Sequence, residues 1–245
     1  ALLNDTFFCK GDSFLLKPLS NYISPYIVNE SFSNSVSGTL IGSAAYKAGG
    51  YVQLTPAQQY TDGQLEWVDS SMKLSQHLTI AYDLFVGENG YPDYYTNYIY
   101  LFNSTTPTNF SSASGGYKIA FSGDGTGNNW IRIYFNSTKI YDVKIGQDFV
   151  GKGWKRVKVI YNNGKFDIYI DNKFLTSYTD ATTRTLAGYK FGLGSNRYSW
   201  TYAEVNVKNF SVALDNPYTP IVPAINQFTF TWNDSYTDSV RWVTN

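Results

Sequence analysis

The sequence predicts an all-β protein, an antiparallel two-sheet jelly-roll sandwich, on three observations. Short runs alternate apolar with polar residues along most of the 245-residue chain, which is the side-chain period of a strand. Gly, Pro, Asn and Asp separate these runs at close spacing, as turns do in sandwiches and jelly rolls. No segment shows the 3.6-residue apolar stripe of an amphipathic helix. Many short strands joined by turns are therefore expected.

The first expected strands follow an N-terminal extension. Residues 1–37 contain Pro18 and Pro25 among polar residues, which predicts an irregular segment with one or two strands at most. Beyond it, a Gly49-Gly50 turn divides two short strands. Alternation then predicts strands over 64–69, 78–86 and 97–102, the second of them central, with Leu78, Ile80, Tyr82 and Leu84 on one side.

The clearest hairpin lies at residues 151–175. Asn163 and Gly164 tolerate the positive φ angles of a type I′ turn, which reverses the chain without splaying the strands. Apolar residues on both sides of the turn are expected to share one face: Val157, Val159, Tyr161, Phe166, Ile168 and Ile170. Lys155 and Asp167 are expected to be exposed to solvent.

The remaining strands surround this hairpin. They are expected over 117–122, 130–135 and 138–145 before it, and over 174–178, 189–193 and 203–214 after it. In the last of these the apolar parity changes near Asn209, which predicts a β-bulge. The sandwich is therefore expected to span residues 38–214.

The tail, residues 215–245, has a different texture. Three prolines within 216–223 indicate an extended linker. Phe228, Phe230 and Trp232 then alternate with polar residues and form an aromatic face that needs a groove to bury in. Either this strand covers an edge of its own sandwich, or it adds to the sheet of a neighbouring copy of the chain.

Composition excludes several classes of partner and site. Charged residues make up 16% of the chain, with 19 basic against 19 acidic, so no net field favours nucleic acid or an anionic membrane. No run approaches the roughly 18 apolar residues of a membrane span. Cys9 is the only cysteine and His77 the only histidine, so intramolecular disulfides, CxxC zinc sites and His-rich metal sites are not expected.

Seven N-x-[ST] triplets predict a secreted, N-glycosylated protein. Chance triplets in an Asn- and Ser-rich chain are the alternative. The single cysteine is unusual for a eukaryotic secreted protein, so an archaeal cell surface or a virion surface fits the extracellular location better. The triplets begin at Asn4, Asn29, Asn103, Asn109, Asn136, Asn209 and Asn233.

Three stretches, in order, resemble the concanavalin A-like lectin and glucanase superfamily, in particular its laminin-G-like domains. They are SAAYKAGGYVQLT at 43–55, GWKRVKVIYNNGKFDIYIDNKFL at 153–175, and YKFGLGSN followed by EVNVKNFSV at the end of the core. The resemblance covers about residues 38–214. It implies two curved antiparallel sheets in a jelly roll, and it does not fix the function.

The resemblance also implies a search for catalytic groups, because the superfamily includes glycosidases and polysaccharide lyases. Glu66 and Asp69 have the wrong parity to share one strand face as a retaining pair would. Tyr46–Tyr51 is similar to an alginate-lyase motif, but the companion motifs are missing, and His77 follows it at the wrong spacing. No catalytic residue and no enzymatic activity are predicted.

Two kinds of ligand remain in view. Asp124 and Asn128 supply loop oxygens suited to calcium, although one carboxylate makes a poor site, so no cofactor is predicted with calcium as the alternative. Aromatic residues in expected loops offer faces on which sugars stack, or surfaces that bury at a protein interface. These residues are Tyr94, Tyr95, Tyr198, Trp200 and Tyr202.

The tail decides the functional prediction. A detached alternating strand behind a proline-rich spacer favours a non-enzymatic structural subunit of an extracellular assembly, such as a filament, surface coat or virion surface. In this assembly the strand of one copy adds to the sheet of a neighbouring copy. The alternative is a carbohydrate-binding lectin or adhesin domain, which the loop aromatics and the resemblance favour.

Overall fold

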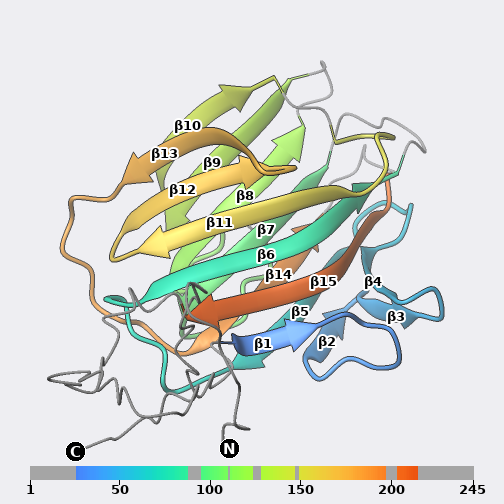
Figure 1. Cartoon of the computed structure of the whole chain (residues 1–245), viewed down its shortest axis with the longest axis horizontal. Coiled ribbons are helices and arrows are strands. Elements are labelled where there is room, and N and C mark those ends of the chain that lie inside the picture. The colour runs from blue at the N-terminus through green and yellow to red at the C-terminus, as the bar shows by residue number, and fades with distance from the viewer. Residues whose placement is uncertain are drawn as a thin grey trace, which may run out of the picture. The chain divides into compact units, whose positions relative to one another are not determined.

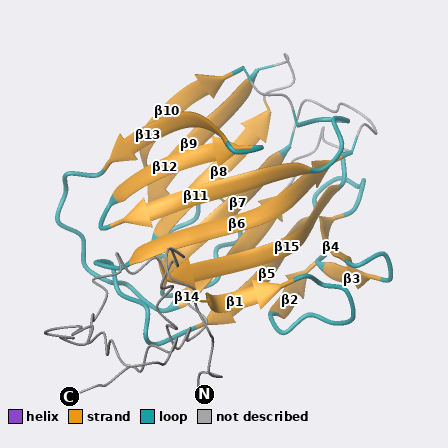
Figure 2. Cartoon of the chain, viewed as in Figure 1, coloured by secondary structure: helices purple, strands orange, loops and turns teal. Residues whose placement is uncertain are grey.

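The computed structural model describes residues 26–87, 95–109, 111–123, 128–146, 149–196 and 203–214. Throughout these ranges the chain forms strands, turns and loops (Figure 2). They pair into two antiparallel sheets, one of eight strands and one of seven, so the predicted all-β class and two-sheet sandwich are confirmed. No helix long and apolar enough to cross a membrane occurs in the described ranges.

The eight-stranded sheet lies in front in Figure 1 and is built around β6 and β15. Its main path runs β13 (Lys173–Thr179), β12 (Lys165–Ile170), β11 (Lys155–Asn162), β6 (His77–Val86), β15 (Val205–Leu214), β4 (Tyr51–Thr55) and β3 (Ala45–Lys47). β1 (Tyr26–Glu30) pairs with the second half of β15. This first strand therefore starts inside the segment predicted as an N-terminal extension.

The seven-stranded sheet lies behind it. Its order is β10 (Thr138–Ile145), β9 (Asn129–Phe135), β8 (Tyr117–Gly123), β7 (Thr96–Asn103), β14 (Lys190–Asn196), β5 (Asp62–Val68) and β2 (Thr39–Gly42). The strand predicted over 78–86 is central, since β6 pairs with both β11 and β15 in the opposite sheet.

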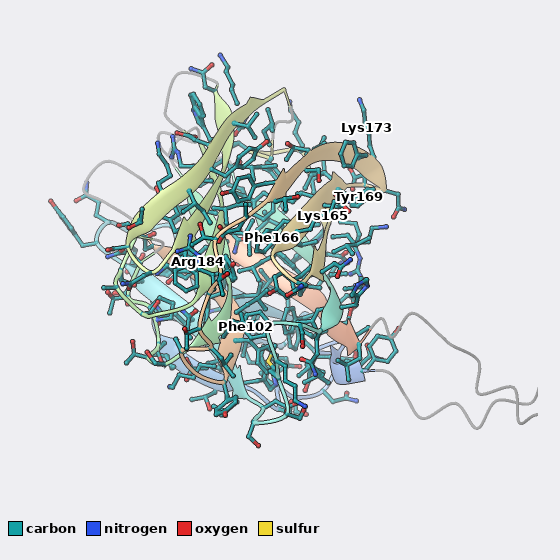
Figure 3. All side chains as sticks on the ribbon, turned by 90° about the vertical axis from the view of Figure 1, so that its left-hand side faces the viewer. Phe102, Lys165, Phe166, Tyr169, Lys173 and Arg184 are labelled. Atoms are coloured by element: carbon teal, nitrogen blue, oxygen red, sulfur yellow. The ribbon has the colours of Figure 1, made fainter. Side chains whose placement is uncertain are left out.

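The core fills the space between the sheets with the alternate residues of their strands. Leu78, Ile80, Tyr82 and Leu84 of β6 are all buried, as their shared parity predicts. Figure 3 shows Phe166 directed between the sheets, whereas Tyr169 lies on the outer side of β12. A polar contact crosses this core where the Tyr82 hydroxyl donates to Asn97.

The predicted hairpin is β11–β12. Asn163 and Gly164 have φ values of 44° and 88°, as a type I′ turn requires, and every apolar residue predicted on the inner face is buried. A second turn of the same kind, at Asp171 (φ 49°) and Asn172 (φ 63°), joins β12 to β13. The predicted bulge in β15 is also present, because the register with β6 shifts between Lys208 and Ser211 and Asn209 has a φ of 51°.

The connection from β13 to β14 crosses from one sheet to the other and is fixed by Asp180. Tyr117 Oη and Arg184 Nε both donate to Asp180 Oδ2, at 2.9 and 2.7 Å. The Arg184 guanidinium also lies 4.2 Å from the centroid of the Phe135 ring. Burial raises the pKa of Asp180, but hydrogen bonds from Arg184, Thr182 and Tyr117 outweigh it and hold this pKa below the usual value.

Candidate functional site

The antiparallel order brings several strand ends together at one end of the seven-stranded sheet, which we call the loop end. The start of β7 pairs beside the end of β8, at Thr96 and Ser122, and Gly123 pairs with Asn129 of β9. The end of β14 at Asn196 pairs with Asp62 at the start of β5. The connections that follow β8 and β14, which hold most of the predicted ligand residues, therefore begin at this end.

The outer face of this sheet carries the residues that alternate with the core positions, and they fall into three rows. The row nearest the loop end contains Asp62, Asn196, Thr96, Ser122, Trp130 and Lys144. The middle row contains Gln64, Gly194, Tyr98, Ala120, Arg132 and Asp142. The third contains Glu66, Gly192, Tyr100, Lys118 and Tyr134.

The two glycines of β14 make room for tyrosines on this face. A Cβ atom at Gly194 would lie 2.2 Å from Cζ of Tyr98, and one at Gly192 would lie 3.0 Å from the Tyr100 hydroxyl. The Tyr98 ring therefore lies against Gly194 and the Tyr100 hydroxyl lies against Gly192, and both tyrosines are buried. Burial raises the pKa of each, for Tyr100 with a further contribution from the Glu66 carboxylate.

The connection between β7 and β8 covers the third row, and we call its described residues, 104–109 and 111–115, the strap. Thr106 Oγ1 donates to Glu66 Oε2 at 2.6 Å, and the carbonyl of Pro107 accepts from the Tyr98 hydroxyl at 3.2 Å. Lys190 Nζ lies 2.6 Å from Glu66 Oε1 and forms an ion pair with this buried carboxylate. The third row is thereby closed to a ligand.

Lys118 lies wholly beneath the strap. Its side chain is 0% exposed, and Nζ donates to the carbonyl of Ser112 and, at 3.0 Å, to Ser114 Oγ. Burial disfavours the charged ammonium and lowers the pKa of Lys118 to about 8. This lysine therefore holds the strap in place and is not offered to solvent.

Beyond the strap lie the half-buried side chains of Trp130 and Arg132, and we define the indole patch as Trp130, Arg132, Ser122 and Asp142. The Arg132 guanidinium lies 5.2 Å from the centroid of the Trp130 ring. Its Nε lies 3.2 Å from Asp142 Oδ1, and its Nη1 donates to Ser122 Oγ at 2.9 Å. An apolar ring face is thus set beside a fixed array of hydrogen-bonding groups.

Further along the row nearest the loop end, Asn196 presents an unsatisfied acceptor. Its side chain is 6% exposed, and no described residue donates to its Oδ1. Asp62, its partner on β5, accepts only a long contact of 3.4 Å from Gln64 among the described side chains. A buried carbonyl without a donor is costly, so this position favours a ligand or water that brings one.

The predicted ligand residues divide into three groups. Tyr95 is 2% exposed, packs 5.9 Å from the ring of Phe149 and donates its hydroxyl to Asn129 Oδ1, so its face is occupied by the core. Asn128 is half-buried and immediately precedes β9. Tyr94, Asp124, Tyr198, Trp200, Tyr202, Phe228, Phe230 and Trp232 lie outside the described residues.

Sequence reasoning missed Trp130 and Arg132 as site residues. The signal was present in the WIRIYF run, where Ile131 and Ile133 take the core parity and leave Trp130 and Arg132 on the other face. A tryptophan at an outward position of a central strand indicates a contact surface. The run was interpreted only as a strand.

Metal ligation finds little support in the described ranges. They hold no group of three or more His, Cys, Asp or Glu side chains that could bind an ion together. Glu66 is paired with Lys190, and Asp142 is paired with Arg132 and Lys139. The described residues therefore do not fit a calcium site, and no role is derived through a metal.

Solved structures at low sequence identity share this architecture. The carbohydrate recognition domain of Emp47p superposes with a TM-score of 0.60 at 13% identity, over 78% of this chain and 96% of that one. The exoplasmic/lumenal domain of VIP36, solved with Ca²⁺ and Man3GlcNAc bound, gives a TM-score of 0.59 at 17% identity, over 76% and 89%. The chain has a concanavalin A-like lectin fold. No protein-family model and no curated protein sequence matches the chain.

This lectin fold corrects the functional prediction. The chain was expected to be a structural subunit held in an assembly by strand exchange, but the solved structures that share its fold are carbohydrate recognition domains and a glycan-bound lumenal domain. The expectation rested on Phe228, Phe230 and Trp232 alone, and an alternating apolar run does not say which groove buries it. The comparison instead favours the alternative, carbohydrate binding.

Proposed function

We propose that the chain is a carbohydrate-binding domain that holds a sugar on the indole patch, at the loop end of the seven-stranded sheet. The observation that carries the proposal is the placement of the part-exposed Trp130 ring beside Arg132, Ser122 and Asp142 on the outer sheet face. Sugar rings combine an apolar face with a rim of hydroxyls. They therefore need a flat apolar surface next to directed donors and acceptors.

The polar groups of the patch suit hydroxyl recognition. Arg132 is fixed by Asp142 and Ser122, so it binds without losing much side-chain freedom. Serine hydroxyls and carboxylates accept hydrogen bonds from sugar hydroxyls, and guanidinium N–H groups donate to them. Asn196 Oδ1 supplies a further acceptor along the row nearest the loop end.

We propose binding without catalysis. The buried carboxylate of Glu66 is engaged by Lys190, Thr106 and Tyr100, and the strap separates it from the open part of the face. Asp142, the acid of the indole patch, accepts from two cations. This arrangement leaves no described pair of acids in which one is free to donate a proton and the other to attack.

We further propose a non-cytoplasmic location. Of the sequon asparagines, Asn29, Asn136 and Asn209 are exposed in the folded chain. The similar domain of VIP36 is described as exoplasmic/lumenal. Glycan ligands and N-glycosylation both belong to such compartments.

The test is a glycan array probed with the intact chain, followed by titration of the best-bound glycan. We expect Trp130→Ala to weaken binding by about thirtyfold, which corresponds to the roughly 2 kcal/mol of a buried aromatic contact. Arg132→Leu is expected to weaken it by at least about tenfold, because hydroxyl acceptors lose their donor. Binding is measured in calcium-containing buffer and again with a chelator.

Two variants on the opposite sheet serve as matched controls. Phe174→Ala removes a more exposed aromatic ring from β13, and Arg156→Leu breaks an ion pair of the same kind, with Asp83 at 3.1 Å. Both are expected to bind as the parent does. A blank array, or equal binding by Trp130→Ala and the parent, would contradict the proposed function.

A further inference from the structure

A second cluster of aromatic and polar side chains lies on the outer face of the eight-stranded sheet. We call it the Trp154 cluster, and it consists of Trp154, Tyr51, Phe85, Lys208 and Asn206. The Trp154 ring lies 5.5 Å from Phe85 of β6 and 6.0 Å from Tyr51 of β4. Lys208 Nζ of β15 lies 4.3 Å from the Trp154 ring centroid.

These distances place the indole over β15. β15 pairs with β6 on one side and with β4 on the other, and the ring contacts residues from both neighbours. Asn206 of β15 pairs with Phe85 and with Gln53, so it lies on the outer face beneath this ring. The indole therefore explains why an outward-facing asparagine is only 4% exposed.

The side-chain amide oxygen of Asn206 lacks a hydrogen-bond donor among the described residues. Its Oδ1 is buried and accepts no hydrogen bond from any described residue. A buried amide oxygen in this state costs about 1–3 kcal/mol until a donor reaches it. The Lys208 ammonium, two residues along the same face, is committed to the indole and does not reach this oxygen.

Two glycines precede Trp154 closely in the chain, and the Gly151 N–H donates to the carbonyl of Val86 at 2.9 Å. Gly151 and Gly153 have φ values of 62° and 73°, and a Cβ atom at Gly153 would have nothing within 4 Å. Trp154 is itself 37% exposed. Among the described residues, the ring is held over the sheet by its contacts with Tyr51, Phe85 and Lys208.

We propose that the Trp154 cluster is a second saccharide site, in which a sugar ring stacks on the indole and directs a hydroxyl to Asn206 Oδ1. One hydroxyl both donates and accepts, so it satisfies Asn206 and takes a hydrogen bond from Lys208. The indole swings aside at Gly153 and packs against the apolar face of the sugar. The site is independent of the indole patch and lies on the opposite sheet.

The surroundings favour a sugar over a protein partner. The charged groups at the rim are already paired, Arg156 with Asp83 at 3.1 Å and Gln53 with Glu204 at 2.8 Å. Asn209 Nδ2 also donates to Asp83, at 2.6 Å. A stable protein interface buries roughly 800 Å² on each partner, whereas this cluster offers one half-exposed indole and two less exposed rings.

The test uses an array of immobilised mono-, di- and trisaccharides with the intact chain and its variants. We expect Trp154→Ala and Asn206→Leu each to weaken binding to the same set of immobilised saccharides by at least about tenfold. Trp130→Ala should retain that set. Phe174→Ala is the matched control, because Phe174 is 52% exposed on the same sheet face, next to Tyr169 and its Lys158 cation, but has no unsatisfied amide beneath it.

A second measurement does not depend on the variants' folding. The parent chain is labelled with 5-fluorotryptophan, its Trp154 resonance is assigned with Trp154→Phe, and the retained saccharides are titrated while the fluorine spectrum is recorded. A shift of the Trp154 resonance is expected.

If all spots disappear in Trp130→Ala and the Trp154 resonance does not move, the second site is refuted and the indole patch stands. If spots survive in Trp130→Ala but are lost in Trp154→Ala and Asn206→Leu, the second site is supported without the indole patch. An array that is blank for the parent chain refutes both proposed sites.

Discussion

At the scale of single residues, Lys118 shows how far the strap changes the chemistry of the sheet face. The chain places a lysine on the outward parity of a central strand, where solvent exposure is the ordinary outcome. The strap instead buries it, with Ser112 and Ser114 as its hydrogen-bond partners. Its folded pKa of about 8 lies below the unfolded value of about 10.4.

This difference predicts a dependence of stability on pH. Between the two pKa values the unfolded chain binds more protons than the folded chain, so stability rises as pH increases through this window. The free energy of unfolding of the parent should rise by about 1 kcal/mol from about pH 8 to about pH 9, relative to Lys118→Met. Urea denaturation at both pH values measures it, with Lys173→Met on the exposed edge strand as the control. An equal pH dependence of parent and Lys118→Met would show that Lys118 is not buried.

At the scale of elements, the β11–β12 hairpin owes its register to two residues. Both turn positions have positive φ, which Gly adopts without strain and Asn tolerates. A Cβ atom at Gly164 would also lie 3.2 Å from the carbonyl oxygen of Asp180, the residue that fixes the crossing to β14. The turn thus supports both the hairpin and the connection beyond it.

Gly164→Ala is therefore expected to lower the free energy of unfolding by about 1–2 kcal/mol, because the alanine is strained at φ 88° and crowds Asp180. Gly146→Ala is the matched control, since a Cβ there meets nothing within 4 Å and its φ is not in the left-handed region. Chemical denaturation of both variants makes the comparison. Equal effects of the two substitutions would argue against strain at the turn.

At the scale of the whole molecule, the proposed sugar sites lie on opposite faces of the sandwich. The sequon asparagines also differ in their exposure to solvent. Asn136 is exposed in the β9–β10 turn, whereas Asn103 is 0% exposed and its Nδ2, the atom that carries an N-glycan, donates to Ser114 Oγ at 2.7 Å. A Cβ atom at Gly116 would lie only 2.0 Å from Oδ1 of Asn103, so this side chain is tightly enclosed. There is no space at Asn103 for a glycan.

Expression through a secretory pathway that attaches N-glycans should therefore modify Asn136 and leave Asn103 bare. Glycopeptide mass spectrometry of the secreted, folded protein measures both sites in the same sample. Asn136→Gln should remove one glycan, while Asn103→Gln should remove none and should lower stability, because it displaces a buried contact with Ser114. A glycan found on Asn103 in folded protein would contradict the burial of that side chain.

The fold was predictable because its signals are local. Alternation in β6, the Asn163-Gly164 turn and the parity change at Asn209 each depend on a few adjacent residues, and the structure confirms all three. The indole patch was not predicted, since Trp130 and Arg132 are ordinary strand residues until the sheet order is known. The function predicted from the tail was wrong for the related reason that an alternating strand does not identify its own partner.

The sequence by itself determined the strands, their turns and the inward faces, because side-chain period and backbone φ preferences act within a few residues. Only the tertiary structure decided which outward residues stay open. The strap buries Lys118 and Glu66, and the indole of Trp154 lies over Asn206, through contacts between segments far apart in the chain. Burial depends on those distant contacts, so the same outward parity gives a part-exposed Trp130 on β9 and a fully buried Lys118 on the neighbouring β8.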